Sequence, residues 1–449
     1  MSATHASFLE NVPSDRLPTL DSARNWFENQ GKRIFIPGKT YLPPSGKVVD
    51  ANDLVALLDS SMDMWLTTGR YALRFKDLLA ARFAVTSAHL TVSGSAANLL
   101  AVTSLTSPSL GKRGLKPGDE VITLACGFPT TVAPIVQNKL VPVFVDVDLQ
   151  TANVRVDRLE AAITPRTRAI IIAHTLGNPF DLAAVVSLAQ KHHLYLIEDC
   201  CDALGATFDG RSVGSFADMG TVSFYPAHHI TTGEGGAVMT SNEELARLID
   251  SFRDWGRACW CEPGCDNTCR SRFSWKLGDL PEGYDHKYIY NHLGYNMKMT
   301  DMQAALGVSQ LEKVETFIAA RRKNHAFLAA LFNTHGLDEH FIVQQATPGA
   351  DPSWFGFLVT IRDGSFLSRN DVVQYLEEHK IGTRLLFAGN MTKQPAFKDV
   401  VYRISGDLDA TDKIMNDSFW IGIWPGLGES ELTYMAETIA EMVRFFKDR

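Results

Sequence analysis

The stretch Ser223-Phe-Tyr-Pro-Ala-His228-His229-Ile-Thr-Thr-Gly-Glu-Gly-Gly236 places two adjacent histidines between a proline and a segment rich in threonine and glycine. No lysine lies between Arg211 and Trp275. An imidazole can remove a proton at neutral pH, because its ordinary pKa is about 6.5. It cannot form the stable imine that a lysine amine forms with an aldehyde. Any chemistry at this stretch must therefore proceed without a lysine imine.

Outward from this stretch, the chain alternates short apolar runs with helical patterns. The apolar runs are residues 119–125, 141–147, 168–174 and 194–199, and a helix is expected at 182–192. Near-continuous apolar runs of this length are typical of strands buried on both faces, and their alternation with helices predicts a mostly parallel sheet. We therefore predict a large α/β domain over residues 45–315.

The two ends of the chain follow other patterns. Residues 1–44 are polar with scattered aromatic side chains, and we expect an arm with little fold of its own. Apolar residues at helical spacing then predict helices from residue 51 and at 71–83. The later elements expected are a long helix at 311–331, a strand at 354–361 and helices at 371–379 and 431–446. This order predicts a smaller C-terminal α+β domain over residues 316–449.

A turn rich in glycine and serine lies early in the predicted large domain. The segment His89-Leu-Thr-Val-Ser93 indicates a strand, and Gly94-Ser-Ala-Ala-Asn98 begins a helix. The first N–H groups of a helix have no partner within it and lie at the positive end of its dipole, which favours a bound phosphate. For this motif alone, a capped helix start without a ligand is the alternative.

The composition limits the classes of function. Hydrophobic residues make up 45% and charged residues 21% of the 449, as in ordinary globular proteins, and the formal net charge is -8. This charge argues against a nucleic-acid partner, which would need clustered Lys and Arg. No secretory signal pattern and no apolar run of membrane-spanning length is found, so we expect a cytoplasmic location and no membrane partner. The seven cysteines are then expected as metal ligands, catalytic groups or buried thiols.

Four of the cysteines are gathered in Cys259-Trp-Cys261-Glu-Pro-Gly-Cys265-Asp-Asn-Thr-Cys269. Thiolates at this density suit a soft metal, either zinc or an iron-sulfur cluster. A Cys-x-Cys pair is less usual in zinc sites, which more often use two Cys-x2-4-Cys pairs separated by a longer span. The residues alone leave both metals open.

Several segments resemble, in the same order and across nearly the whole chain, motifs of the DegT/DnrJ/EryC1/StrS sugar aminotransferases, which depend on pyridoxal phosphate. The matching segments are 223–236, Ser93-Gly-Ser-Ala-Ala97, Gly-Phe128-Pro-Thr-Thr, Ile197-Glu-Asp199 with Ala203-Leu-Gly-Ala206, and Leu293-Gly-Tyr-Asn296-Met-Lys-Met-Thr-Asp-Met-Gln-Ala-Ala305. The resemblance implies an aspartate-aminotransferase-like fold (pyridoxal phosphate fold type I). It also implies that His228 stands where those enzymes carry the cofactor lysine.

The resemblance further implies a role for each cofactor residue. Asp199 would pair with the pyridine nitrogen, and Phe128 would lie against the face of the ring. Asn296 would reach the phosphate of the neighbouring subunit, which implies a homodimer. Asp202 replaces the Gln or His usual at that position and could bond the ring hydroxyl or tune nearby charge. The phosphate would be held by Gly94, Ser95, Ala96 and Ser223.

A histidine in place of the lysine implies a cofactor held without a covalent bond, most usefully as pyridoxamine phosphate, with His228 as the base. Lysine-free sites of this kind resemble those of the hexulose 3-dehydrases. Those enzymes remove the hydroxyl at carbon 3 of nucleotide-linked 4-keto-6-deoxyhexoses through an adduct with the cofactor. The resemblance implies the same reaction here, with the nucleotide, CDP or dTDP, left open.

The cysteines also resemble those of the CDP-6-deoxy-hexulose 3-dehydrases that carry a 2Fe-2S cluster, whose ligands follow the pattern Cys-x57-Cys-x-Cys-x7-Cys. The residues at this spacing are Cys201, Cys259, Cys261 and Cys269, the last three in an insertion expected at 257–290. The resemblance implies that Cys200 and Cys265 are not ligands. Because such a cluster passes one electron at a time, it also implies a separate flavin-containing reductase and a 3-deoxy sugar product.

Two other functions are compatible with the same residues. One keeps the enzyme but changes the reaction, to a lysine-free aminotransferase variant or a 3-dehydratase coupled to deamination. The other is a noncatalytic sensor of sugar nucleotides or of redox state. For a nucleotide-linked substrate, Arg384 and Arg403 are candidates for contact with the diphosphate.

Overall fold

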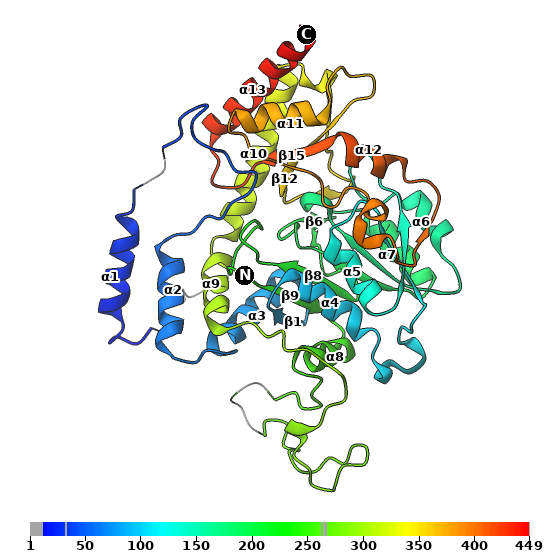
Figure 1. Ribbon diagram of the computed structural model, residues 1–449. Helices are drawn as coiled ribbons and strands as arrows, with labels where there is room; N and C mark the ends of the chain where they lie inside the picture. The colour runs from blue at the N-terminus through cyan, green and yellow to red at the C-terminus, as the bar shows by residue number, and fades with distance from the viewer. Residues whose placement is uncertain (1–11, 32–33, 262–263, 265–266, 449) are drawn as a thin grey trace.

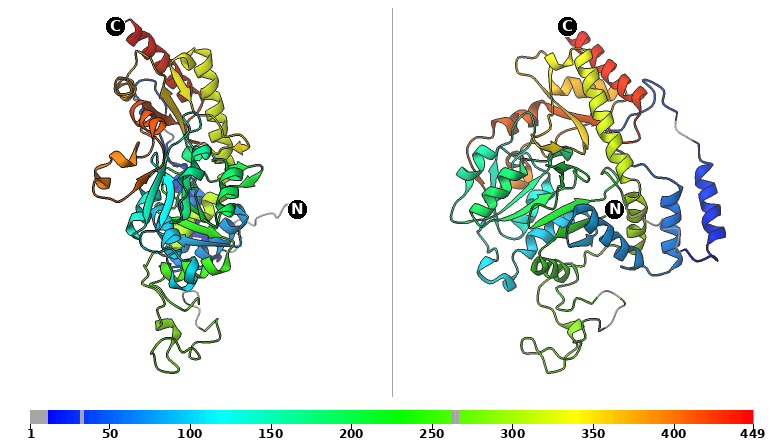
Figure 2. Two further views of the ribbon diagram at one scale, coloured as in Figure 1. Left: turned by 90° about the vertical axis from the view of Figure 1, so that its right-hand side faces the viewer. Right: turned by 180° about the vertical axis from the view of Figure 1, so that it is seen from behind.

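The structure is a computed structural model that describes residues 12–31, 34–261, 264 and 267–448. Figure 1 shows a large domain around the main sheet and a smaller domain that carries the C-terminus. The long helix α10 (Val314–Thr334) runs from one domain into the other. A loop segment that follows helix α8 (Glu243–Arg253) projects from the large domain in all three views (Figures 1 and 2).

The main sheet has eight strands, and its core is parallel. Strands β14, β3, β2, β4, β5 and β8 pair in parallel, while β9 and β1 are added antiparallel at one edge. All five residues of β2 are buried, as expected for a strand covered on both faces. In sheet order the strands are β1 (Ser87–Thr91), β9 (Gly236–Thr240), β8 (Met219–Ser223), β5 (Tyr195–Asp199), β4 (Thr167–Ala173), β2 (Glu120–Leu124), β3 (Val141–Val145) and β14 (Arg403–Ile404). The predicted α/β architecture with a mostly parallel sheet is confirmed.

Helices cover both faces of this sheet. Helices α4, α5 and α8 form one apolar core with the strand side chains on one face of the sheet. Helices α6 and α7 form a second core with the strand side chains on the other face. Helices α2, α3 and α9 pack together beside the β1 edge. Their bounds are α2 (Ala51–Met62), α3 (Arg70–Phe83), α4 (Gly94–Ser104), α5 (Pro129–Gln137), α6 (Val156–Ala162), α7 (Leu182–Lys191) and α9 (Asp301–Leu311).

The expectation of an arm with little fold of its own was wrong for residues 17–28, which form helix α1 (Leu17–Glu28). A proline in its first turn fixes a helical φ, and the buried Leu20 packs in the core beside α2. Arg16 forms an ion pair with the fully buried Asp59, 2.9 Å away. These contacts are distant in sequence, so local patterning could not reveal them. Residues 1–11 and 32–33 lie outside the described residues.

The end of the arm does lie across another part of the chain. Leu42 forms a β-bridge with Ile381, and the Gly382 N–H donates to the Leu42 carbonyl at 2.9 Å. The Trp424 indole donates to the Pro43 carbonyl at 3.1 Å. The arm is therefore held against the smaller domain before it enters α2.

The smaller domain has an antiparallel sheet in the order β10-β12-β15-β13, packed against helices. The expected long helix is α10, which begins at Val314. Residues 301–311 form a separate helix, α9, and a capping box between Thr300 and Gln303 marks its N-terminus. The remaining elements are β10 (Phe341–Val343), β12 (Gly356–Ile361), β13 (Thr383–Arg384), β15 (Ser418–Gly422), α11 (Arg369–Glu378), α12 (Asp409–Asp417) and α13 (Glu429–Lys447), with a separate small sheet of β6 (Thr207–Phe208), β7 (Arg211–Ser212) and β11 (Ala350–Asp351).

The chain of the smaller domain returns to the main sheet at β14, and this places Arg403 away from the site edge. Its guanidinium contacts the carboxylate of Glu120, with Nη2 at 2.8 Å from Oε2. Glu120 is fully buried at the start of β2, which is the amino end of the parallel strands. The expectation that Arg403 meets a diphosphate was therefore wrong, because its charge neutralises a buried carboxylate.

Among the described residues, no helix combines the length and the apolar character needed to cross a membrane.

We predict that Arg403→Met lowers the free energy of unfolding by about 2–3 kcal/mol. This is less than the roughly 3–5 kcal/mol that removing one partner of a buried pair usually costs, because Arg166 still contacts Glu120. Arg384→Met is the matched control: Arg384 is exposed, so we expect a change within about 0.5 kcal/mol. Urea unfolding of both variants measures the difference, and equal stability of the two would contradict the structural role of Arg403.

Candidate active site

Asp199 ends strand β5 at the carboxyl edge of the sheet and is almost completely buried. Its Oδ2 accepts hydrogen bonds from the Asn98 amide at 2.8 Å and from the Thr131 hydroxyl at 2.7 Å. Its Oδ1 accepts from the Cys201 backbone N–H at 3.1 Å. The carboxylate is thus fixed in orientation by groups on three segments and keeps acceptor capacity on Oδ1 for a cationic partner.

The turn before α4 lies against the end of β8. Ser93 caps the helix through a hydrogen bond from the Ala96 N–H, while the first-turn N–H groups of Gly94 and Ser95 have no partner within the helix. A Cβ added at Gly94 would lie 2.5 Å from Cβ of Ser223, closer than real carbon atoms approach. The predicted phosphate residues Gly94, Ser95, Ala96 and Ser223 are therefore brought together.

Phe128 precedes α5, at the end of the loop that follows β2. Its side chain is 49% exposed and meets Phe387 edge-on, with ring centroids 6.2 Å apart. An exposed ring beside the buried Asp199 cluster is available to cover a flat ligand. The structure thus places Phe128 on the same sheet edge as the other predicted cofactor residues.

His228 lies in the loop between β8 and β9, and its imidazole is partly exposed. Nδ1 is 3.3 Å from Oδ1 of Asp202, which is an ion-pair distance without the alignment of a hydrogen bond. The ring also lies 5.3 Å, centroid to centroid, from that of Phe355 in the smaller domain. Asp202 is therefore positioned to bias the orientation of the His228 ring.

The neighbouring His229 has a different environment. It is 3% exposed, and its Nε2 donates to the Ser353 carbonyl at 2.8 Å. Burial, together with the positive Arg321 nearby, holds the pKa of His229 well below its ordinary value. His229 is thus a neutral structural residue, and His228 is the member of the pair whose ring is partly exposed.

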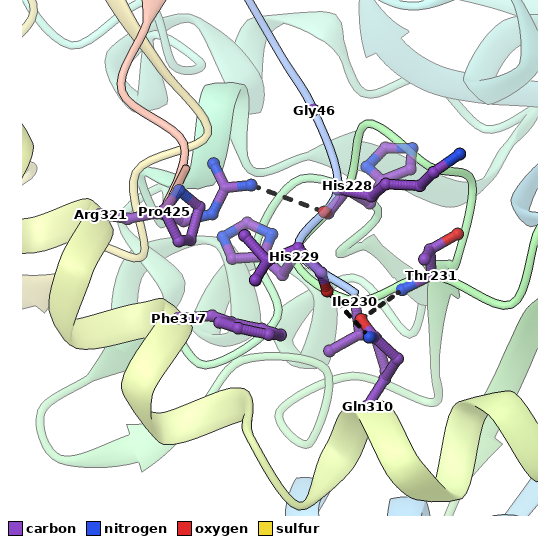
Figure 3. Close-up of a pocket in the computed structure, with 11 residues that line it drawn as sticks. Gly46, His228, His229, Ile230, Thr231, Gln310, Phe317, Arg321 and Pro425 are labelled. Carbon is purple, nitrogen blue, oxygen red and sulfur yellow. Dashed lines mark hydrogen bonds between the residues drawn. The ribbon is translucent and has the colours of Figure 1, made fainter. Parts of the chain in front are cut away.

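Arg321 supports the histidine loop through the backbone carbonyl of His228 (Figure 3). Its Nη2 lies 3.5 Å from the His228 carbonyl, and its Nη1 donates to the Phe355 carbonyl at 3.1 Å. Burial lowers the pKa of this guanidinium to about 10, so it stays charged at neutral pH. Gln310 accepts from the Thr231 N–H in the same small pocket. These contacts fix the backbone of the loop.

Asn296 lies outside this cluster, in a group at the base of the projecting loop. Its Oδ1 accepts from Nζ of Lys298 at 2.8 Å, and Lys298 lies 3.7 Å from the centre of the Trp255 ring. Burial lowers the pKa of Lys298, although its bond with Asp254 opposes the shift. The role of Asn296 toward a neighbouring subunit stays a prediction.

Three of the four predicted metal-ligand cysteines lie together in the projecting loop, and a histidine lies with them. The ligand atoms of Cys259, Cys261 and His286 are all within 4.8 Å of one another. The Cys269 Sγ is 3.2 Å from Nε2 of His286. Burial raises the pKa of the Cys259 thiol to about 11. Burial also acts to raise the pKa of the Cys261 thiol, but hydrogen bonds from Thr268 and the Cys269 backbone outweigh it and lower this pKa to about 6.

Cys201 occupies a different position. A Cβ added at Gly94 would lie 2.9 Å from its Sγ, which places this thiol beside the predicted phosphate turn. Burial, reinforced by the Asp199 carboxylate, raises the pKa of Cys201 well above its ordinary value. No group of three or more metal-binding side chains in the described part of the chain includes Cys201. Cys265 lies outside the described residues, and the ligand role of Cys201 stays a prediction.

Sequence reasoning missed the residues that support the site. Asn98 and Thr131 hold Asp199, Arg321 holds the histidine loop, and His286 faces the cysteines. Asn98 directly follows the predicted phosphate turn and lies one turn inside the helix. As a polar residue at that position, it could have been predicted from the sequence to support the site. No local pattern indicates Arg321, because its partners lie in two other segments. Arg384 lies exposed at β13 with its Nη1 bonded to the Thr383 carbonyl.

The fold agrees with the comparison to known proteins. Residues 48–440 match the DegT/DnrJ/EryC1/StrS aminotransferase family, and the chain belongs to this family. It is 56% identical over 407 residues to the lipopolysaccharide biosynthesis protein RfbH of Salmonella typhimurium, covering 91% of this chain and 93% of that protein. It is 52% identical over 441 residues to dTDP-4-dehydro-2,6-dideoxy-D-glucose 3-dehydratase of Saccharopolyspora spinosa, covering 98% and 95%.

Solved structures show the same fold. GDP-4-keto-6-deoxy-D-mannose-3-dehydratase of E. coli with bound hydrated PLP superposes with a TM-score of 0.79 at 29% identity, over 89% of this chain and all of that one. A histidine-to-asparagine mutant of GDP-4-keto-6-deoxymannose-3-dehydratase with bound GDP-perosamine gives a TM-score of 0.80 at 30% identity, over 89% and 100% of the two chains. The predicted aminotransferase-like fold is confirmed.

We predict that His229→Gln weakens the pH dependence of stability on the acid side. The folded pKa of His229 is depressed, so below about pH 6.5 the unfolded chain binds a proton that the folded chain does not, and stability falls as pH falls. A glutamine amide can still donate to the Ser353 carbonyl but does not titrate. Urea unfolding between pH 7 and 5.5 should show a slope reduced by up to about 1.4 kcal/mol per pH unit; an unchanged slope would contradict the neutral state of His229.

Proposed function

We propose that this chain is a 3-dehydratase of a nucleotide-linked 4-keto-6-deoxyhexose that uses pyridoxamine phosphate held without a covalent bond. The observation that carries the proposal is His228, a partly exposed imidazole beside Asp202. By the sequence resemblance, this residue stands where the family carries a lysine. Relatives named as 3-dehydratases of nucleotide sugars, at 52% and 32% identity, support the reaction class. The lipopolysaccharide biosynthesis relative supports a role in deoxysugar synthesis.

The residues at the carboxyl edge of the sheet fit this cofactor. The free N–H groups of Gly94 and Ser95 and the Ser223 hydroxyl suit a phosphate, and a side chain at Gly94 would fill that space. The fixed Asp199 carboxylate suits a protonated pyridine nitrogen, and the exposed Phe128 suits the ring face. When bound, pyridoxamine phosphate supplies an amine that condenses with the sugar ketone and a ring that withdraws electrons.

His228 performs the proton transfer in this proposal. Its ring is partly exposed, while Arg321 holds the backbone carbonyl of the same residue in place. Asp202 orients the ring, because one of its carboxylate oxygens lies 3.3 Å from Nδ1. Without a lysine to capture the aldehyde form, the amine form of the cofactor persists in the site.

The overall reaction requires reduction. Conversion of a 4-keto-6-deoxyhexose to the 4-keto-3,6-dideoxyhexose breaks the bond between carbon 3 and its hydroxyl, consumes two electrons and two protons, and releases water. We assign the cysteine group of the projecting loop to a 2Fe-2S cluster that delivers the electrons singly. A separate flavin-containing reductase would take the electron pair from a nicotinamide nucleotide and pass it on in two steps.

The functional unit in this proposal is a homodimer. Asn296 would enter the phosphate site of the neighbouring subunit, as the family resemblance implies. Arg384 is the remaining candidate for the diphosphate of CDP or dTDP, since Arg403 is occupied by Glu120.

An anaerobic assay tests the reaction. The full-length protein, loaded with pyridoxamine phosphate, is given CDP- and dTDP-linked 4-keto-6-deoxyhexoses with and without a flavin reductase and a nicotinamide nucleotide. We expect a 4-keto-3-deoxy sugar only in the complete mixture, with two electrons consumed per product. An amino sugar as product would contradict the proposal and support the aminotransferase reaction. A 3-deoxy sugar formed without a reductase, together with released ammonia, would contradict it and support the deaminating reaction. Absence of turnover with either substrate would favour a sensor.

We predict that His228→Asn lowers the rate of hydroxyl loss by about 100-fold or more, the usual contribution of a positioned base, while the cofactor still binds. The measurement is single-turnover product formation together with cofactor content after gel filtration. His335→Asn, at an exposed histidine after α10, is the control and should be unchanged. Normal turnover of the His228 variant would refute the assignment of the base.

We predict that Gly94→Ala weakens binding of pyridoxamine phosphate about tenfold or more. The added methyl overlaps Ser223 and Cys201, and overpacking of this kind costs about 1–3 kcal/mol. Gly31→Ala is the matched control, because an added Cβ there meets no atom within 4 Å. Titration of cofactor fluorescence gives the affinity, and thermal unfolding without cofactor separates a loss of stability from a loss of binding. Equal affinity in both variants would argue against a phosphate at this turn.

A further inference from the structure

Trp420 belongs to the smaller domain but packs against the large one. It lies in strand β15 between Phe419 and Ile421, whose side chains are part of the smaller domain's own core. Because successive side chains of a strand point to opposite faces of the sheet, Trp420 points the other way. There it is buried in the apolar core that α6 and α7 form with the main sheet. Trp420 is therefore a contact between the two domains.

The indole ring of Trp420 packs on one side of the active site. Its centroid lies 5.5 Å from that of the Phe355 ring, and the Phe355 ring lies 5.3 Å from that of His228. A Cβ added at Gly356 would lie 2.5 Å from Cε3 of Trp420, so only glycine lets the indole lie against the backbone of β12. Trp420 therefore supports the ring that packs against His228.

The indole N–H of Trp420 reaches the other side of the site. Nε1 donates to the Leu385 carbonyl at 3.1 Å, in the loop that follows β13. Two residues further along this loop, the Phe387 ring meets the Phe128 ring edge-on, with the centroids 6.2 Å apart. The same side chain is therefore connected to both His228 and Phe128, in each case through one intermediate aromatic residue.

The loop that carries Phe387 has a strained backbone. Phe387 has a φ of 45°, in the left-handed region that a bulky residue rarely adopts. Such a conformation persists only where the surrounding structure imposes it. On one side of Phe387 the bond from Trp420 holds the Leu385 carbonyl, and on the other side the Ala388 N–H donates to the Gly127 carbonyl at 3.2 Å. Loss of the bond from Trp420 therefore releases one end of the strained segment.

We propose that Trp420 is a positioning residue of the active site, which sets the place of the Phe128 ring relative to that of His228. Its ring supports His228 through Phe355, and its N–H supports Phe128 through the loop of Phe387. The roles of the two ends, a base and a cover for the cofactor ring, rest on the proposed function. Removing the N–H alone should affect Phe128 and leave the His228 side in place.

The test compares full-length Trp420→Phe with the matched control Trp424→Phe. Each substitution removes an indole N–H that donates to a backbone carbonyl at 3.1 Å, but Trp424 bonds to Pro43 of the arm. Para-fluorophenylalanine in place of Phe128 reports the surroundings of that ring by fluorine NMR, without cofactor. Thermal unfolding measures the stability of each variant, and titration of cofactor fluorescence measures its affinity for pyridoxamine phosphate.

We expect Trp420→Phe to shift the fluorine resonance at position 128 and to weaken binding of pyridoxamine phosphate by about three- to tenfold, the equivalent of one hydrogen bond. Trp424→Phe should lose similar thermal stability and show neither change. An unmoved resonance, or equal changes in the two variants, would overturn the role of Trp420. A wild type that binds no pyridoxamine phosphate would overturn the proposed function, and the fluorine resonance would still decide the role of Trp420.

Further variants test the two connections separately. Because the N–H acts through Phe387, Trp420→Phe should weaken cofactor binding little further in a Phe387→Leu background, and additive losses would overturn that connection. Trp420→Leu removes the ring, and Gly356→Ala displaces it. Both should lower the single-turnover rate of hydroxyl loss at saturating cofactor, whereas Trp420→Phe should not. A wild-type rate in whichever of the two remains folded would overturn the support of His228.

Discussion

The close approach of the first helix turn of α4 to the ends of β8 and β9 is the constraint on which the site depends. A Cβ at Gly94 would lie 2.5 Å from Ser223, and one at Gly236 would lie 2.5 Å from the Ser93 carbonyl carbon. Only glycine leaves room at either point, so the two segments can touch through their backbones. This contact brings the helix N-terminus to the edge where β5 delivers Asp199, and Asn98 of the same helix then holds Asp199 and accepts from Thr221.

The adjacent histidines show how the same residue type takes opposite roles under different burial. His229 lies inside, bonded to a carbonyl of the smaller domain, and is kept neutral by the lost solvation of its charged form. His228 keeps partial contact with solvent and faces a carboxylate. Arg321 separates the two environments, since its buried charge binds the backbone of the loop and disfavours a second positive charge on His229.

The sequence was sufficient to predict the strands and the functional residues at their ends. It was insufficient to predict contacts between segments that are distant in the chain. Strands β2 and β5 lie within the predicted runs because burial on both faces leaves an uninterrupted apolar signature. Asp199 was recognisable as the residue that ends such a run. Helix α1 and the role of Arg403 were not, because their partners Asp59 and Glu120 are far away in the chain. His286 has no signature of its own: a histidine after an aspartate in a loop is ordinary until the fold places three thiols around it.

The two centres are stabilised in different ways, and the base of the loop connects them. The cofactor edge rests on a packed sheet, whereas the described residues of the cysteine loop between 258 and 285 bury no side chain fully. The base of that loop is joined to the segment after it by β-bridges between Arg257 and Tyr290 and between Asp254 and Asn296. A metal that orders the loop therefore also restrains Asn296. If Asn296 enters the neighbouring subunit as proposed, loading the metal in one protomer orders the residue that completes the phosphate site of the other, which couples electron supply to cofactor binding across the dimer.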